Sequence, residues 1–274
     1  MNRAFRLLAL AALEEADCKN NKCLPLRTLP SATSTRDPNP NSASSPNPTT
    51  TDWSNQHRPC QKPVEEKPVR LPVTPTSMKL FKLDLKESSL SREMKHLVWS
   101  VAALAFNGAF RIHELLSWTS SQFDPNFTLL GRDVNLKTIK VAGKKVSILQ
   151  VKIKSPKTDR VGADTIVDVY ESGGPLCPLR AFSNWRAVAA HTIKSYLLFI
   201  DHQGLPLTGK RFNTILKDSW GKYLDYRVGK ITSHSFRAGI ASLPGVIGFS
   251  EGEIKAVGRW SSRAYLDYLK LPRD

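Results

Sequence analysis

The sequence has few cysteines, and they lack the spacings of the usual cysteine sites. Only four occur in 274 residues, with no C-x-x-C pair and no histidines at zinc-site spacing. This pattern argues against both a disulfide framework and a zinc site. We expect free thiols in a reducing compartment, at Cys18, Cys23, Cys60 and Cys177.

Long apolar runs are missing as well. No stretch approaches the roughly 18–20 residues of a membrane-spanning helix, so we expect no membrane partner. Residues 1–15 combine a basic tip with an apolar run that is too short for the core of a signal peptide. We expect a short amphipathic helix over residues 1–17.

Acidic residues are scarce relative to basic ones. Forty Lys and Arg face 24 Asp and Glu, which gives a net charge of +16. Such a balance favours a polyanionic partner, with nucleic acid first and an anionic membrane surface second. The alternative is a basic scaffold protein without a specific partner.

Large apolar residues are sparse between residues 24 and 75, where 11 of the 18 prolines lie. A segment of this composition buries too little surface to offset the entropy of ordering it. We therefore predict a short helix plus a disordered segment over residues 1–70 and a single domain over 71–274.

That domain opens with helical patterns. A short helix is expected after Pro75, and apolar residues then recur at helical spacing from Leu90 to Ala105. Ser89 or Ser91 can cap this second helix, and Asn107-Gly108 can end it. Arg111 opens the next helix, where an arginine either faces an anion or pairs with Glu114.

Residues 128–171 change to the period of two that is typical of strands. VSILQVKIK and TIVDVY alternate, and the polar segment SPKTDRVGAD between them indicates a hairpin. An earlier strand over residues 137–141 completes a small three-stranded sheet.

Helix signals return in the C-terminal third, with SYLLFI as a short extended piece before most of them. The expected helix starts are Pro178, Thr208, Thr232 or Ser233, Ser250 with Glu253, and Ser261 or Ser262. The helix from Thr208 should run to about Lys222, and the one from Ser250 should end at Gly258. A final helix should hold Tyr265 and Tyr268.

Several of these elements bear side chains suited to metal-free phosphodiester chemistry. Such chemistry needs a nucleophile, a clamp for the non-bridging oxygens and a proton donor for the leaving oxygen. Arginine forks match phosphate, and histidine assists proton transfer. The candidates are, in chain order, Arg111, Lys154 or Lys157, His234, Arg237, Trp260 and Tyr268.

This set resembles the catalytic domain of the tyrosine recombinases, the phage-integrase family. The similar stretches are AFNGAFRIHELLSW, IKSPKTDRVG, HSFRAGIAS and VGRWSSRAYLDYLK. They are most similar to recombinases of DIRS-type retrotransposons and cryptons. The resemblance spans about residues 71–272 and implies an α+β, mainly α-helical fold with a small three-stranded antiparallel sheet.

The resemblance also implies a mechanism and a partner, double-stranded DNA. The tyrosine attacks the scissile phosphate, forms a 3′-phosphotyrosyl link and releases a 5′-hydroxyl, without metal, ATP or another cofactor. Arg111 and Arg237 hold the phosphate oxygens, and Lys157 protonates the leaving oxygen. His234 binds the phosphate or takes the tyrosine proton. Trp260 packs against the site.

Two assignments have alternatives. Lys157-Thr158 fits the Lys-Thr pattern of the family, with Lys154 in reserve. Tyr268 lies eight residues after Trp260, and its Tyr-Leu-Lys context resembles the usual Tyr-Ile-Arg. Tyr265 is the reserve nucleophile, although it is favoured as a core aromatic.

The sequence departs from the family at its N-terminal side. Family members clamp DNA with an additional helical domain, which we do not expect the proline-rich residues 1–75 to supply. Three other functions therefore compete with a DNA strand-exchange enzyme: a catalytically idle DNA-binding relic, a type IB topoisomerase and a basic scaffold. Nuclear localisation, assembly of protomers on DNA and origin from a mobile element are further expectations from the resemblance.

Overall fold

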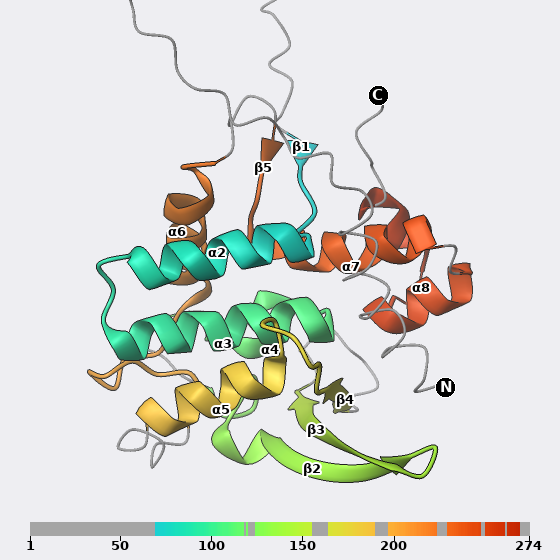
Figure 1. The fold of residues 1–274 in the computed structure, drawn as a ribbon, viewed down its shortest axis with the longest axis horizontal. Coiled ribbons are helices and arrows are strands. Elements are labelled where there is room, and N and C mark those ends of the chain that lie inside the picture. Colours follow the sequence, from blue (N-terminus) through green and yellow to red (C-terminus); the bar gives the residue numbers. More distant parts are fainter. Residues whose placement is uncertain are drawn as a thin grey trace, which may run out of the picture. The chain divides into compact units, whose positions relative to one another are not determined.

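The computed structural model describes residues 69–117, 119, 124–154, 164–189, 197–223, 229–247, 250–260 and 262–268. The predictions for residues 1–68, including the N-terminal helix and the disordered segment, lie outside this part of the chain. The elements are β1 (Val69–Arg70), α2 (Pro75–Glu87), α3 (Arg92–Gly108), α4 (Ile112–Leu115), η1 (Gly131–Asp133), β2 (Val134–Val141), β3 (Lys144–Ile153), β4 (Thr165–Tyr170), α5 (Pro178–Val188), α6 (Gly209–Trp220), β5 (Gly229–Lys230), α7 (Ser233–Ile247), α8 (Glu251–Gly258) and η2 (Arg263–Tyr268) (Figure 1).

Helix α3 is the centre of the hydrophobic core. Ser91, one of the two serines predicted as its cap, accepts a hydrogen bond from the Met94 amide. Twelve of its 17 residues are buried, so it is apolar on nearly all sides. It packs between α2 and α5 and also contacts α4, α7 and β4 (Figure 1). The segment that follows it, where the candidate site begins, is therefore held by rigid neighbours.

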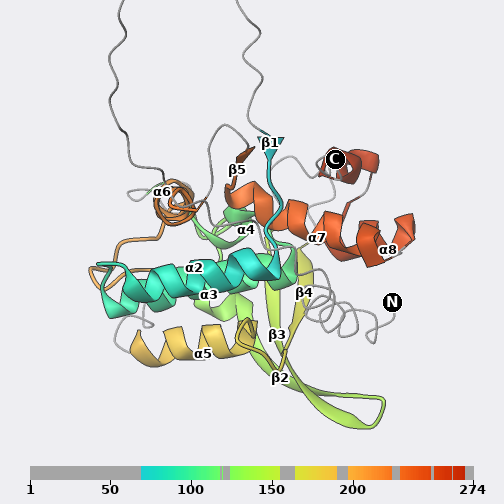
Figure 2. The same cartoon turned by 45° about the horizontal axis from the view of Figure 1, so that its top comes forward.

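Strands β2, β3 and β4 form the predicted three-stranded antiparallel sheet. Strand β2 begins at Val134, three residues earlier than predicted, and pairs Val134 with Val151. The tight β2–β3 turn uses two left-handed residues, Ala142 (φ 48°) and Gly143 (φ 79°), as a two-residue hairpin requires. This hairpin extends away from the helices (Figures 1 and 2).

A close approach between α7 and the segment before α2 joins the two ends of the domain. The Val73 amide donates to the Ser235 carbonyl at 2.9 Å. A Cβ on Gly239 would lie 2.1 Å from the Val73 carbonyl oxygen, so only glycine allows this packing. Nearby, β1 and β5 pair in parallel, which sequence patterns did not predict (Figure 2).

Three C-terminal predictions can be compared with the structure. Ser250 and Glu253 form the predicted capping box. Helix α6 ends at Trp220, two residues before the expected end at Lys222. The expected final helix is a 3₁₀ helix over Arg263–Tyr268, because short terminal segments adopt the tighter i→i+3 pattern readily.

The described residues bear on two further predictions, those for the cysteines and for membrane-spanning helices. Cys177 is a buried free thiol. Within the same residues, no helix is long and apolar enough to cross a bilayer.

Two histidines are expected to make stability depend on pH. Burial lowers the pKa of His113, and burial with help from Arg92 lowers the pKa of His96 against the opposing effect of Glu93. The unfolded chain therefore binds more protons than the folded chain once the pH falls toward the ordinary histidine pKa of about 6.5.

We expect the free energy of unfolding to decrease from pH 7.5 to pH 5.5 in urea titrations. The variant His96→Gln/His113→Gln should flatten this dependence, and an unchanged slope would contradict the assignment.

Candidate active site

The turn between α3 and α4 presents two backbone carbonyls to the site. Ala109 adopts the left-handed conformation (φ 51°) and caps α3. The Phe110 ring is fully buried beneath the turn, and a Cβ on Gly108 would lie 2.1 Å from it. The small residues and the buried ring thus fix where the Gly108 and Ala109 carbonyls lie.

Arg111 follows this turn as the N-cap of α4. Its amide donates to the Glu114 carboxylate at 2.8 Å, and its guanidinium Nη1 lies 3.1 Å from the same carboxylate. This is the ion pair that the sequence offered as an alternative role. The Arg111 side chain is nevertheless 58% exposed, whereas that of Glu114 is 14% exposed. The guanidinium is therefore anchored by one ion pair and accessible to an anion.

Arg237 reaches the same place from α7. It is 2% exposed. Its guanidinium donates to three carbonyls, those of Ala109, Gly258 and Arg259. The guanidinium carbon also lies 4.8 Å from the centroid of the Trp260 ring. Backbone carbonyls and an aromatic face thus hold a buried guanidinium rigidly.

A third arginine, Arg259, completes the cluster and was not among the predicted site residues. It caps α8 in the left-handed conformation (φ 55°). Its guanidinium donates to the carbonyls of Gly108 at 2.7 Å and Ala109 at 3.1 Å, and to the Glu114 carboxylate at 2.9 Å. It also stacks over Phe110, 5.0 Å from the ring centroid. The only sequence signal was its distance of nine residues from Tyr268.

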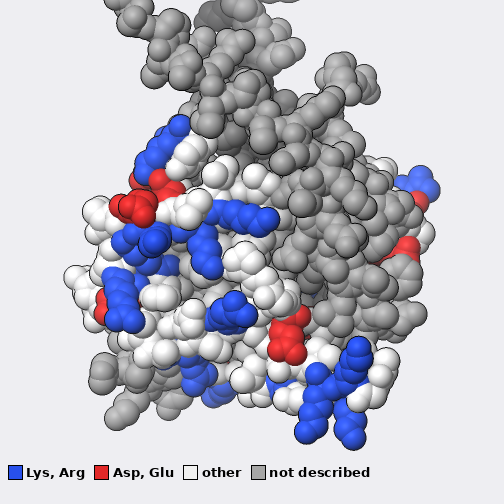
Figure 3. Space-filling view, viewed as in Figure 1, with Lys and Arg blue, Asp and Glu red and all other residues white. Residues whose placement is uncertain are grey.

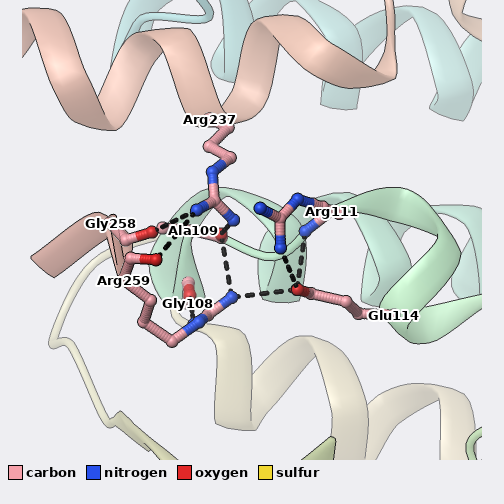
Figure 4. A network of polar contacts seen from close by, with 7 residues as sticks. All are labelled: Gly108, Ala109, Arg111, Glu114, Arg237, Gly258 and Arg259. Atoms are coloured by element: carbon pink, nitrogen blue, oxygen red, sulfur yellow. Dashed lines mark hydrogen bonds and ion pairs between the residues drawn. The ribbon is translucent and has the colours of Figure 1, made fainter. Parts of the chain in front are cut away.

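These contacts make one network (Figure 4). The guanidiniums of Arg111 and Arg259 both contact the carboxylate of Glu114, and those of Arg237 and Arg259 share the Ala109 carbonyl. The cluster thus has more positive than negative charge, and its cationic forks suit a bidentate oxyanion such as phosphate.

Trp260 and Tyr265 pack beside the cluster. Their ring centroids are 6.2 Å apart. A Cβ on Gly258 would lie 1.5 Å from the Trp260 ring, so glycine is needed there. Tyr265 is 4% exposed, which fits its reading as a core aromatic. Tyr268 ends the same 3₁₀ helix, and its side chain lies outside the described part of the chain.

Comparisons with known proteins find similar folds among solved structures but no similar sequences. No family model matches the sequence, and no curated protein is significantly similar to it. Among solved structures, the post-cleavage complex of the XerH site-specific recombinase with a palindromic difH substrate matches with a TM-score of 0.51 at 12% identity. The match covers 75% of this chain and 51% of that one. The pre-cleavage XerH complex with difH gives a TM-score of 0.50 at 12% identity, covering 73% and 50%.

The chain has a tyrosine-recombinase-like catalytic domain fold. The predicted fold class, α+β and mainly helical with one three-stranded antiparallel sheet, is confirmed. The chain spans about half the length of the XerH structures that it matches. The likeness at this identity concerns the fold, so the roles of individual residues remain predictions.

Both candidate lysines follow β3 in the sequence, and only Lys154 belongs to the described residues. Lys154 is 11% exposed and pairs with Asp133 at 3.0 Å. It also donates to the carbonyls of Thr128 and Pro125. These contacts engage Lys154 in holding the chain around residues 125–133. Lys157 lies in the 155–163 segment, outside the described residues.

His234 lies in the first turn of α7, three residues before Arg237. Its side chain is exposed, whereas that of Arg237 is buried. Residues three apart lie on the same side of a helix, so His234 sits next to Arg237 and closer to solvent. This position suits a group that meets a ligand arriving from solution.

Proposed function

We propose that the chain is a DNA breaking-and-rejoining enzyme of the tyrosine recombinase type. The observation that supports this most is that Arg111, at the start of α4, and Arg237, from α7, belong to one polar network within a tyrosine-recombinase-like fold. The two arginines are about 125 residues apart in sequence and are linked through Glu114, Arg259 and the Ala109 carbonyl. The Arg111 guanidinium is accessible and can bind the phosphate. The Arg237 guanidinium is buried and held by carbonyls, so it is preorganised to stabilise the transition state.

The proposed reaction uses only side chains. The Tyr268 hydroxyl attacks the scissile phosphorus in line while His234 accepts its proton. A 3′-phosphotyrosyl bond forms as the bond from phosphorus to the 5′-oxygen breaks, and Lys157 gives that oxygen a proton. Arg111 and Arg237 stabilise the extra charge of the pentavalent transition state.

Rejoining runs the same steps backwards. A 5′-hydroxyl attacks the phosphotyrosyl bond, gives up its proton and restores both the DNA backbone and the tyrosine. One phosphate ester is exchanged for another in each direction, so the reaction needs no ATP. General acid help from Lys157 would contribute about 10²–10⁴ in rate.

The charge on the surface favours DNA as the substrate. Figure 3 shows many Lys and Arg side chains and few Asp and Glu on the visible face of the described residues. Burial, and to a smaller extent the positive charge of the neighbouring Arg180, lower the pKa of Lys82 on α2. Binding should weaken with salt at a log–log slope of about −0.9 per phosphate contact.

The finer parts of the proposal come from the sequence resemblance. We place the chain with recombinases of mobile elements of the DIRS or crypton kind, acting in the nucleus and assembling as a homo-oligomer on DNA. The stretches HSFRAGIAS and VGRWSSRAYLDYLK support this placement.

The proposal predicts a covalent adduct between the full chain and supercoiled plasmid, trapped with SDS. The adduct should form in EDTA and without ATP, because no step needs a metal ion or a nucleotide. Arg111→Ala should lower the rate of adduct formation by about 10²–10³, the effect of losing one preorganised donor to the developing charge.

A matched control is Lys210→Ala on α6, which removes one exposed positive charge outside the network. Plasmid retention in a mobility-shift assay without any adduct would contradict the enzyme and favour the alternative, a catalytically idle DNA-binding relic.

A further inference from the structure

Arg259 occupies a left-handed backbone conformation that few of the other described residues share. Among the described non-glycine residues, positive φ occurs at Ala109, Ala142 and Arg259. Ala142 belongs to the β2–β3 turn, but the other two meet directly, because Arg259 donates to the Ala109 carbonyl at 3.1 Å. Conformations of this kind cost free energy and persist where surrounding contacts enforce them.

The Arg259 guanidinium uses its fork on three acceptors at once. Nη1 binds the Gly108 carbonyl, while Nη2 binds the Ala109 carbonyl and the Glu114 carboxylate. A lysine ammonium lacks the planar fork that spans these acceptors. The contacts therefore fasten the end of α8 to the α3–α4 turn through one side chain (Figure 4).

The same contact changes the electrostatic surroundings of Arg111. Glu114 lies between two guanidiniums, with Arg259 at 2.9 Å and Arg111 at 3.1 Å. Without Arg259, the largely buried carboxylate would be neutralised by Arg111 alone and would hold Arg111 more tightly. Arg259 thus neutralises part of the Glu114 charge, so that the carboxylate holds Arg111 less tightly and Arg111 stays accessible.

Arg259 also contacts Arg237 and leads into the segment that holds the proposed nucleophile. Its carbonyl accepts a hydrogen bond from the Arg237 guanidinium. Trp260 follows it and stacks on Arg237, and η2 ends at Tyr268. A single residue therefore links both proposed clamp arginines to the C-terminal segment.

We propose that Arg259 is a positioning residue that locks residues 250–268 onto the α3–α4 turn and, through Glu114, keeps Arg111 free to bind phosphate. The locking part depends on the fold alone, whereas the part that concerns phosphate rests on the proposed function. Two measurements on the full chain test these parts separately.

Hydrogen exchange tests the lock without any DNA. Arg259→Gln should raise amide exchange in residues 250–260 by about 10- to 100-fold, since two charge-assisted contacts and one ion pair are lost. The matched control is Arg263→Gln, which removes the same charge from a side chain that is 76% exposed and pairs with Glu251. Equal exchange in the two variants would overturn the lock.

Single-turnover cleavage of supercoiled plasmid tests the effect on Arg111. Arg259→Gln should slow adduct formation by about 10²-fold, the effect of small misplacement of a clamp residue, while DNA affinity stays within about twofold. Adding Glu114→Gln should raise the rate about tenfold above that of Arg259→Gln alone. The glutamine side-chain oxygen can still accept a hydrogen bond from the Arg111 backbone N–H, but it no longer holds the Arg111 guanidinium by charge.

The double variant distinguishes positioning from simple damage to the fold. If Arg259 only stabilises the structure, then removing the Glu114 charge as well should not speed cleavage, and that result would overturn the electrostatic part. If wild type forms no adduct, the proposed function fails, and hydrogen exchange still decides whether Arg259 locks the segment.

Discussion

Replacing Tyr268 with phenylalanine is expected to abolish the SDS-resistant adduct while DNA binding stays unchanged. The substitution removes one hydroxyl oxygen, which is the atom that would bond to phosphorus, and keeps the ring. The expected effect is a complete loss of covalent product, because phenylalanine has no oxygen with which to form the phosphotyrosyl bond. Denaturing gels of plasmid reactions measure the adduct, and mobility shifts measure binding.

Tyr265→Phe is the matched control for this prediction. Tyr265 lies three residues earlier on the same 3₁₀ helix and is 4% exposed against Trp260. Losing its hydroxyl should leave adduct formation near the wild-type rate. If Tyr268→Phe still forms the adduct and Tyr265→Phe does not, the nucleophile is Tyr265, and the assignment of Tyr268 is wrong.

Replacing Arg237 with lysine is expected to lower both the cleavage rate and the stability. Lysine keeps the charge but lacks the fork that reaches the carbonyls of Ala109, Gly258 and Arg259. The cleavage rate should fall by about 10²–10³. The free energy of unfolding in urea should fall by about 1–3 kcal/mol, because buried carbonyls lose their donors.

Arg111→Lys provides the contrast. The Arg111 side chain is 58% exposed and makes one ion pair, so stability should change by less than about 1 kcal/mol while the rate still falls. A lysine at position 237 that cleaves DNA at the wild-type rate would contradict a role for the Arg237 guanidinium in clamping phosphate.

Local signals predicted most helices and the sheet. Ser91, Thr208 and Ser250 cap the helices that they were expected to cap, since a cap needs only neighbouring residues. The three-stranded sheet followed from alternation and from turn residues. The parallel pair of β1 and β5 was missed, because each strand has two residues and pairs across about 160 positions of sequence.

The candidate site was predictable to a smaller extent. Arg111, Arg237 and Trp260 were predicted from motifs, and the structure brings them into one cluster, while their catalytic roles stay predictions. Arg259 was missed because a C-cap arginine resembles a solvated residue until tertiary packing places it on Gly108 and Glu114. The ion pair of Lys154 with Asp133 is a tertiary contact that no local pattern shows, and the choice of Lys157 over Lys154 stays a prediction.

The most direct test of the central claim is peptide mapping of the trapped adduct by mass spectrometry. After nuclease and protease digestion, our account predicts a residual nucleotide joined through its 3′-phosphate to Tyr268. A nucleotide on another residue, a link through a 5′-phosphate, or no adduct from a chain that binds the plasmid would contradict it.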